Sequence, residues 1–159
     1  MSGITLVVED RAWRSHRGLQ ASLTRAADAA RRSAKLKGGF TILLANDRKL
    51  RALNRDFRRK DKPTNVLSFP MYAPEELLTL EEERLPEIML GDIVLARETC
   101  LREAADKDLP VATHATHLIV HGVLHLLGYD HIDDEDAENM EALERRIMAD
   151  LGHDDPYGD

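Results

Sequence analysis

The chain has 159 residues, of which 43% are hydrophobic and 32% are charged. These values are ordinary for one soluble globular domain and exclude a wholly disordered chain. No apolar run approaches the roughly 20 residues of a membrane-spanning helix, and the N-terminus lacks the pattern of a signal peptide. With one cysteine, Cys100, the chain forms no internal disulfide. We therefore expect a single domain, residues 1–159, in the reducing cytoplasm, without a membrane partner.

The charges are divided unevenly along the chain, although the net charge is only -7. Residues 1–70 hold 16 Lys and Arg against 6 Asp and Glu, whereas residues 71–159 hold 6 against 23. Such asymmetry is one sign of contact with nucleic acid. The alternative is that both sets of charges only solvate opposite surfaces.

Two strands and two helices are expected in the first part of the chain. They are a strand at 4–8, a helix at 15–37, a strand at 40–45 and a helix from 46 to 57. Gly38 should end the first helix, and Asn46 is a suitable N-cap for the second. The second helix should bury Leu50, Leu53 and Phe57, which recur at helical spacing.

The second part of the chain adds two strands and three helices. The strands are expected at 66–69 and 88–96, on either side of an acidic loop, and the helices at 96–107, 111–127 and 134–150. Together with the earlier elements, this order predicts an α+β fold, with a small mixed four-stranded sheet covered by about five helices.

Four histidines lie on one stripe of the expected helix at 111–127. At about 100° per residue, His114, His117, His121 and His125 all point to the same side. Neutral imidazoles would crowd one another there and charged ones would repel, and a divalent cation relieves both problems. His121 and His125, four residues apart, are spaced to bind one metal ion. His117 and His121 have the same spacing, so the spacing alone does not choose between the two pairs.

The residues that follow His125 favour the second pair. Gly128 can adopt a left-handed conformation that ends the helix and turns His131 back toward His121 and His125. The resulting H-x-x-x-H-x-x-G-x-x-H pattern is the ligand skeleton of metzincin metalloproteases. Three histidines with an open fourth position suit catalytic zinc, and nickel and copper are alternatives.

One departure from the protease pattern bears on the reaction. Metalloproteases of this type carry a general-base glutamate directly after the first histidine, where this chain has Gly122. A basic segment, residues 48–62, holds eight Lys and Arg against two Asp. Most of these cations are expected to form a solvated helix face. Arg58, at the end of the helix, is best placed to grip a phosphate beside the metal, which favours phosphodiester cleavage over peptide cleavage.

Three segments resemble the signature segments of the YbeY endoribonucleases, bacterial enzymes of ribosomal RNA maturation. They are LNRDFRRKDKPTNVLSFP (53–70), GDIVLA (91–96) and HGVLHLLGYDH (121–131). The resemblance implies a metal-dependent endoribonuclease specific for single-stranded RNA, acting on the 3′ end of small-subunit ribosomal RNA and in ribosome quality control. It also implies that His121, His125 and His131 bind zinc and that Arg58 is the functional arginine. Its partners would be ribosomal RNA and the small ribosomal subunit.

Two other functions remain open at this point. A metalloprotease-like hydrolase accounts for the histidines but not for Gly122. A metal-stabilised ribosome-binding module without catalysis accounts for the charge asymmetry, although an open site made of histidines is unusual for a structural metal. His117, Asp92 and Asp130 are weaker candidates for the site, since packing, strand-end solvation or turn formation explains them equally well.

Overall fold

The fold is built around a mixed four-stranded sheet. The computed structural model describes residues 3–34, 38–77, 88–129 and 134–157. Its strands are β1 (Ile4–Val8), β2 (Gly39–Ala45), β3 (Val66–Pro70) and β4 (Met89–Ala96), in the spatial order β1-β2-β4-β3. β1, β2 and β4 are parallel, and β3 pairs with β4 in antiparallel orientation at one edge. The predicted sheet is confirmed.

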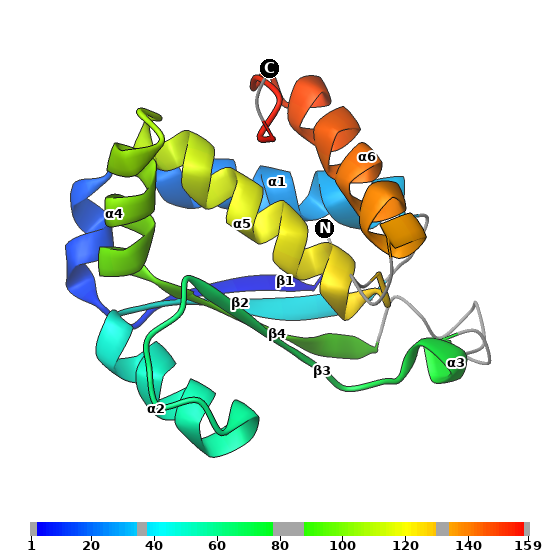
Figure 1. Cartoon of the computed structure of the whole chain (residues 1–159), viewed down its shortest axis with the longest axis horizontal. Helices are drawn as coiled ribbons and strands as arrows, with labels where there is room; N and C mark the ends of the chain where they lie inside the picture. The colour runs from blue at the N-terminus through cyan, green and yellow to red at the C-terminus, as the bar shows by residue number, and fades with distance from the viewer. Residues whose placement is uncertain (1–2, 35–37, 78–87, 130–133, 158–159) are drawn as a thin grey trace.

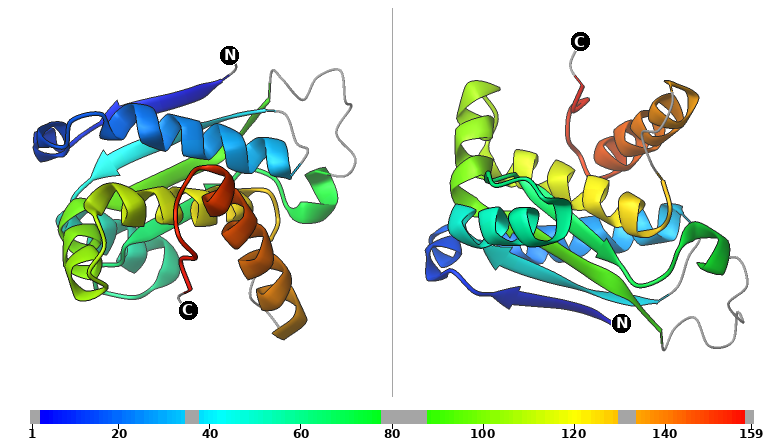
Figure 2. Two further views of the ribbon diagram at one scale, coloured as in Figure 1. Left: turned by 90° about the horizontal axis from the view of Figure 1, so that it is seen from above. Right: turned by 60° about the horizontal axis from the view of Figure 1, so that its bottom comes forward.

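Helices pack on both faces of this sheet. They are the 3-10 helix η1 (Arg11–Ser15) and the α-helices α1 (Leu19–Ser33), α2 (Asp47–Arg58), α3 (Pro74–Leu77), α4 (Arg97–Asp106), α5 (Val111–Leu126) and α6 (Asp134–Asp150). α1 and α5 lie side by side over one face, α6 packs on α5, and α2 lies under the other face (Figures 1 and 2). Among the described residues five α-helices have ten or more residues, so the predicted α+β fold is confirmed.

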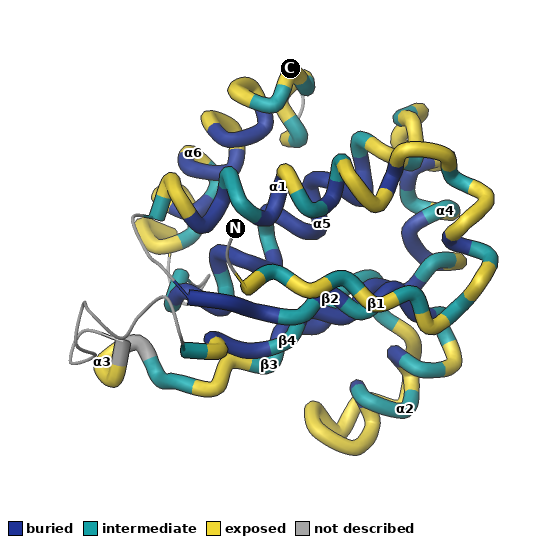
Figure 3. The backbone as a smooth tube through the Cα atoms, turned by 180° about the vertical axis from the view of Figure 1, so that it is seen from behind, coloured by how far each residue is buried: buried dark blue, intermediate teal, exposed yellow. Residues whose placement is uncertain are grey.

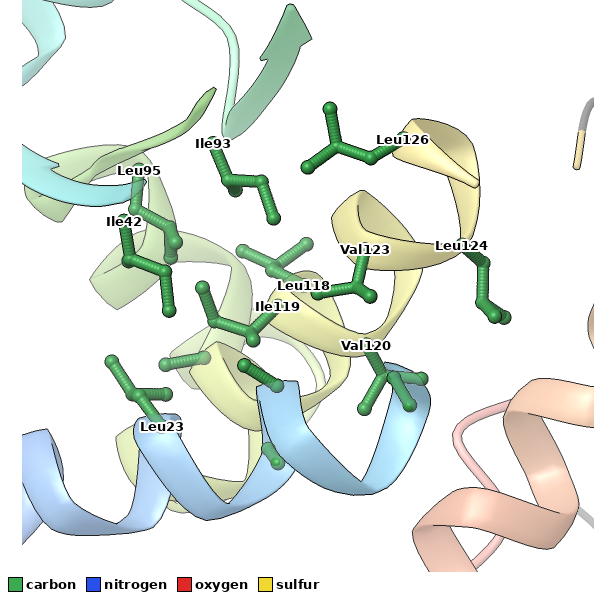
Figure 4. Packing of buried hydrophobic residues seen from close by; sticks show 14 of the residues in the cluster. Leu23, Ile42, Ile93, Leu95, Leu118, Ile119, Val120, Val123, Leu124 and Leu126 are labelled. Carbon is green, nitrogen blue, oxygen red and sulfur yellow. The ribbon is translucent and has the colours of Figure 1, made fainter. Parts of the chain in front are cut away.

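The main core lies between the sheet and the α1–α5 layer. Ile42, Ile93 and Leu95 point from the strands toward Ile119 of α5 and Leu23 of α1 (Figure 4). Burying each such side chain stabilises the fold by about 1.5–3 kcal/mol. α5 is buried on nearly every side because it contacts the sheet, α1, α4 and α6. This packing holds the histidine helix rigidly against the sheet.

The opposite face of the sheet is less well covered. α2 packs there through a small cluster that includes Leu50, Leu67 and Val94. Much of α2 is exposed, in contrast to the buried β2 and α5 (Figure 3). Phe57, predicted to belong to the core face of this helix, is 66% exposed, so that prediction is wrong. The helical spacing is as expected, but the last turn of α2 lies beside a part of the sheet that no other described element covers.

The first helix also begins later than predicted. Gly18 has a left-handed backbone (φ 77°) and precedes the first residue of α1, so residues 15–18 are not part of it. The preceding turn is η1, where Asp10 caps Ala12 N at 2.9 Å and Trp13 donates from its indole to Ala45 O at 2.7 Å. Asn46 caps α2 as predicted, accepting from Lys49 N at 2.9 Å. In the part of the chain that the structure describes, no helix has the length and apolar character needed to cross a bilayer.

Candidate active site

α5 places its four histidines in two different environments. His114 and His117, on the first two turns, are buried. His121 and His125, on the last turns, line a cleft of about 380 Å³ at the edge of the sheet. The helix therefore separates a buried pair from an accessible pair, and only the accessible pair can meet a substrate in the cleft.

The ring nitrogens of His121 and His125 point at each other. Their Nε2 atoms are 3.0 Å apart, and the rings are nearly perpendicular. Two imidazole nitrogens bound to one tetrahedral metal ion at about 2.1 Å would lie about 3.4 Å apart. The pair therefore fits one metal ion with little rearrangement. No set of three potential ligands converges within the described residues, and the third predicted ligand, His131, lies outside them.

A carboxylate on α6 orients His121. Glu144 is fully buried, and its Oε1 lies 2.7 Å from His121 Nδ1. Since a carboxylate only accepts, Nδ1 donates, and neutral His121 keeps its Nε2 lone pair toward His125 and the cleft. Histidines that bind metals commonly have such a partner, which fixes the tautomer and the ring orientation. The sequence pattern of α6 does not single out Glu144.

Glu144 is a carboxylate in spite of its burial. Burial by itself would raise its pKa, but hydrogen bonds from His121 and the Tyr157 hydroxyl, together with the nearby His117, outweigh burial and lower the pKa to about 2. His117 Nε2 lies 3.5 Å from Glu144 Oε1 and makes no hydrogen bond within the described residues. The ring of Tyr157 packs against His117, and its pKa is raised by burial and by Glu144. The lowered pKa keeps Glu144 negatively charged behind His121 near neutral pH.

Arg58 lines the same cleft from the opposite side. It ends α2, and its Nη2 donates to Ser68 O of β3 at 3.0 Å. The turn that follows is tied back to α2: Asn54 Nδ2 donates to Lys62 O at 2.9 Å, and Lys60 N donates to Asn54 O at 3.1 Å. The structure therefore brings Arg58 to the cleft that His121 and His125 line, as the sequence predicts.

The packing around Gly122 leaves no room for the glutamate that metalloproteases carry at this position. This residue lies where α5 crosses the sheet, and Ser68 Oγ donates to Gly122 O at 3.0 Å. A Cβ at position 122 would meet Ile93 Cγ2 at 3.0 Å and Ser68 Oγ at 3.3 Å. A longer side chain has no room, and it would point into the helix–sheet interface. The position next to His121 therefore cannot supply a general base.

The remaining sequence predictions have mixed outcomes. Gly128 has the predicted left-handed backbone (φ 100°) at the end of α5. Asp130, like His131, lies outside the described residues. Asp92, a weaker candidate for the site, lines a hollow on the other face of the sheet, because neighbouring residues of a strand point to opposite faces. Cys100 is buried, and burial raises its pKa to about 12.

Comparison with known proteins assigns the family. A family model described as "Endoribonuclease YbeY" matches residues 8–152. The chain belongs to the YbeY family. The resemblance predicted from three segments is thereby confirmed.

Two YbeY relatives show how far the likeness extends. A protein of Rhizorhabdus wittichii named Endoribonuclease YbeY is 57% identical over 129 residues, covering 81% of this chain and 76% of its own length. One of Erythrobacter litoralis with the same name is 52% identical over 151 residues, covering 94% of this chain and 92% of its own length.

A solved structure shares the fold. The solution structure of a Thermotoga maritima protein has a TM-score of 0.60 and 20% identity, and the match covers 93% of this chain and 88% of that one.

Proposed function

We propose that this chain is a zinc-dependent endoribonuclease of the cytoplasm that cuts single-stranded RNA. Its role would be the processing of ribosomal RNA on the small ribosomal subunit, including maturation of the 3′ end of the small-subunit RNA, and ribosome quality control. The names of its relatives support the activity. The observation that carries the proposal is that His121, His125 and Arg58 line one cleft.

His121, His125 and His131 would hold the zinc ion. Imidazole is a ligand that zinc accepts readily, and Glu144 keeps the Nε2 lone pair of His121 available. A bound zinc ion supplies Lewis acidity at the scissile phosphate. With three histidines as ligands, one coordination position would stay open to the substrate.

Arg58 would hold the phosphate. Its guanidinium can donate two parallel hydrogen bonds to phosphate oxygens, and it favours the negative charge that develops during cleavage. The bond from Arg58 to Ser68 O anchors the side chain at the cleft before substrate arrives. This reduces the conformational entropy lost on binding.

The competing functions are separated by one experiment. Purified protein is incubated with single-stranded RNA, double-stranded RNA or casein, with and without a chelator. Cleavage of single-stranded RNA alone, abolished by the chelator and restored by zinc, supports the proposal. Cleavage of casein would identify a metalloprotease. Binding of RNA without cleavage of either polymer would favour a non-catalytic ribosome-binding module.

A further inference from the structure

A second hollow lies on the face of the sheet opposite α5. It has a volume of about 410 Å³, and five apolar side chains line most of it. We call it the Phe57 groove. These side chains are Leu43 of β2, Val94 of β4, Phe69 of β3, and Leu53 and Phe57 of α2. Neither His121 nor His125 lies in it.

One aromatic ring of the groove is largely exposed. The chain has three Phe, and two of them meet here, with ring centroids of Phe57 and Phe69 5.5 Å apart and the rings steeply inclined. Phe57 remains 66% exposed, whereas Phe69 is half-buried. Single exposed apolar residues are common, but an exposed ring that packs on a second ring in a concave apolar surface is typical of a binding site.

The groove and the cleft are lined by adjacent residues of the same two elements. Residues of a strand alternate between faces, so Ser68 of β3 lines the cleft whereas Phe69 lines the groove. At the end of α2, Arg58 lines the cleft and Phe57 lines the groove. A strand of nucleic acid that leaves the cleft beside Arg58 and passes the edge strand β3 would come next to Phe57.

The charge beside the groove suits a polyanion. Residues 47–62 hold eight Lys and Arg against three Asp. Arg51 pairs with Asp61 and Arg55 with Asp56, whereas Arg59 and Lys60 form no ion pair within the described residues. Asp92 is the carboxylate that lines the groove itself, and Lys49 lines it too. The balance along α2 is positive.

The free edge of β3 is poorly suited to a protein partner that adds a strand. Val66 N already donates to Asn65 Oδ1 at 2.7 Å, and Ser68 O accepts from Arg58. Pro70 has no N–H to donate. An edge blocked in this way resists strand addition. We infer that the Phe57 groove binds bases of the single-stranded RNA next to the segment held in the cleft, by stacking on Phe57.

This inference rests on the proposed function, and its test uses the length of the RNA. Binding is measured by fluorescence anisotropy with uncleavable 2′-O-methyl RNA of about 4 and about 12 nucleotides, a range of typical single-strand sites. Phe57→Leu keeps an apolar side chain but removes the aromatic face, and Phe57→Tyr keeps the ring. Val7→Ala is the matched control, because Val7 is exposed (42%) and lies on β1 at the other edge of the sheet.

The expected result is specific to the longer RNA. Loss of one stacked base weakens binding by about fivefold to a hundredfold. Phe57→Leu should therefore bind the longer RNA at least fivefold more weakly and the shorter RNA unchanged, whereas Phe57→Tyr and Val7→Ala should match the wild type. If Phe57→Leu binds RNA of both lengths with wild-type affinity, the inference is overturned, and the groove is better explained as a docking site for a protein. An equal loss at both lengths would also overturn it. Cleavage of RNA by the wild type tests the proposed function separately.

Discussion

Replacing Glu144 with Gln should show whether Glu144 orients His121 for metal binding or only packs in the core. Gln has nearly the same shape, but it lacks the charge that strengthens the bonds from His121 Nδ1 and the Tyr157 hydroxyl. A hydrogen bond to a charged group contributes about 1 kcal/mol more than a neutral one, so two such bonds imply a loss of about 2 kcal/mol in the free energy of unfolding. Because His121 would be less well oriented and less basic, zinc affinity should fall about tenfold to a hundredfold.

Zinc affinity is measured by competition with a chromogenic chelator, and stability by urea unfolding. Glu138→Gln is the matched control, since Glu138 is an exposed residue of the same helix and should give wild-type values in both measurements. If Glu144→Gln is destabilised but binds zinc with unchanged affinity, Glu144 only supports packing. The assignment of His121 orientation to Glu144 would then be refuted.

Three further predictions concern α5 and the proposed zinc site. Gly122→Glu should destabilise the fold by several kcal/mol in thermal melts and confer no casein cleavage, because a charged side chain would be buried against Ile93. His114 is hydrogen-bonded to Glu103, but its burial lowers the pKa of its imidazole. The unfolded state therefore takes up a proton at higher pH than the folded state does, so the wild-type free energy of unfolding should fall as pH drops below about 6.5, the pKa of an unfolded histidine. His114→Gln should reduce this dependence on pH in urea unfolding between about pH 7 and about pH 5. His131→Ala should lose bound zinc by elemental analysis, whereas His114→Ala should keep it.

Helical periodicity predicted the parts of the site that lie on one element. The four histidines share a face of α5, and α6 has the predicted bounds, Asp134–Asp150. Such patterns depend only on the 3.6-residue repeat and on caps, which are local properties. The conformation of Gly128 was predictable for the same reason, since a left-handed residue commonly ends a helix.

Contacts between elements were not predictable in this way. Glu144 was not predicted, because its partners His121 and Tyr157 are 23 and 13 residues away in sequence. Phe57 follows the apolar spacing of α2, yet the sheet beneath it is open. Periodicity identifies which residues share a face, and tertiary packing decides what lies against that face.

In the proposed mechanism, Arg58 grips the scissile phosphate beside the zinc ion. The most direct test compares Arg58→Lys with Arg59→Lys in single-turnover cleavage of one labelled single-stranded RNA, with thermal melts to verify folding. Both changes keep the charge, and both residues are exposed at the end of α2, but only Arg58 lines the cleft. Loss of the two-pronged grip should slow cleavage by Arg58→Lys by on the order of 10²-fold with zinc content intact, and Arg59→Lys should cleave like the wild type. Equal and small losses of cleavage rate in the two variants would show that Arg58 has no special role in cleavage.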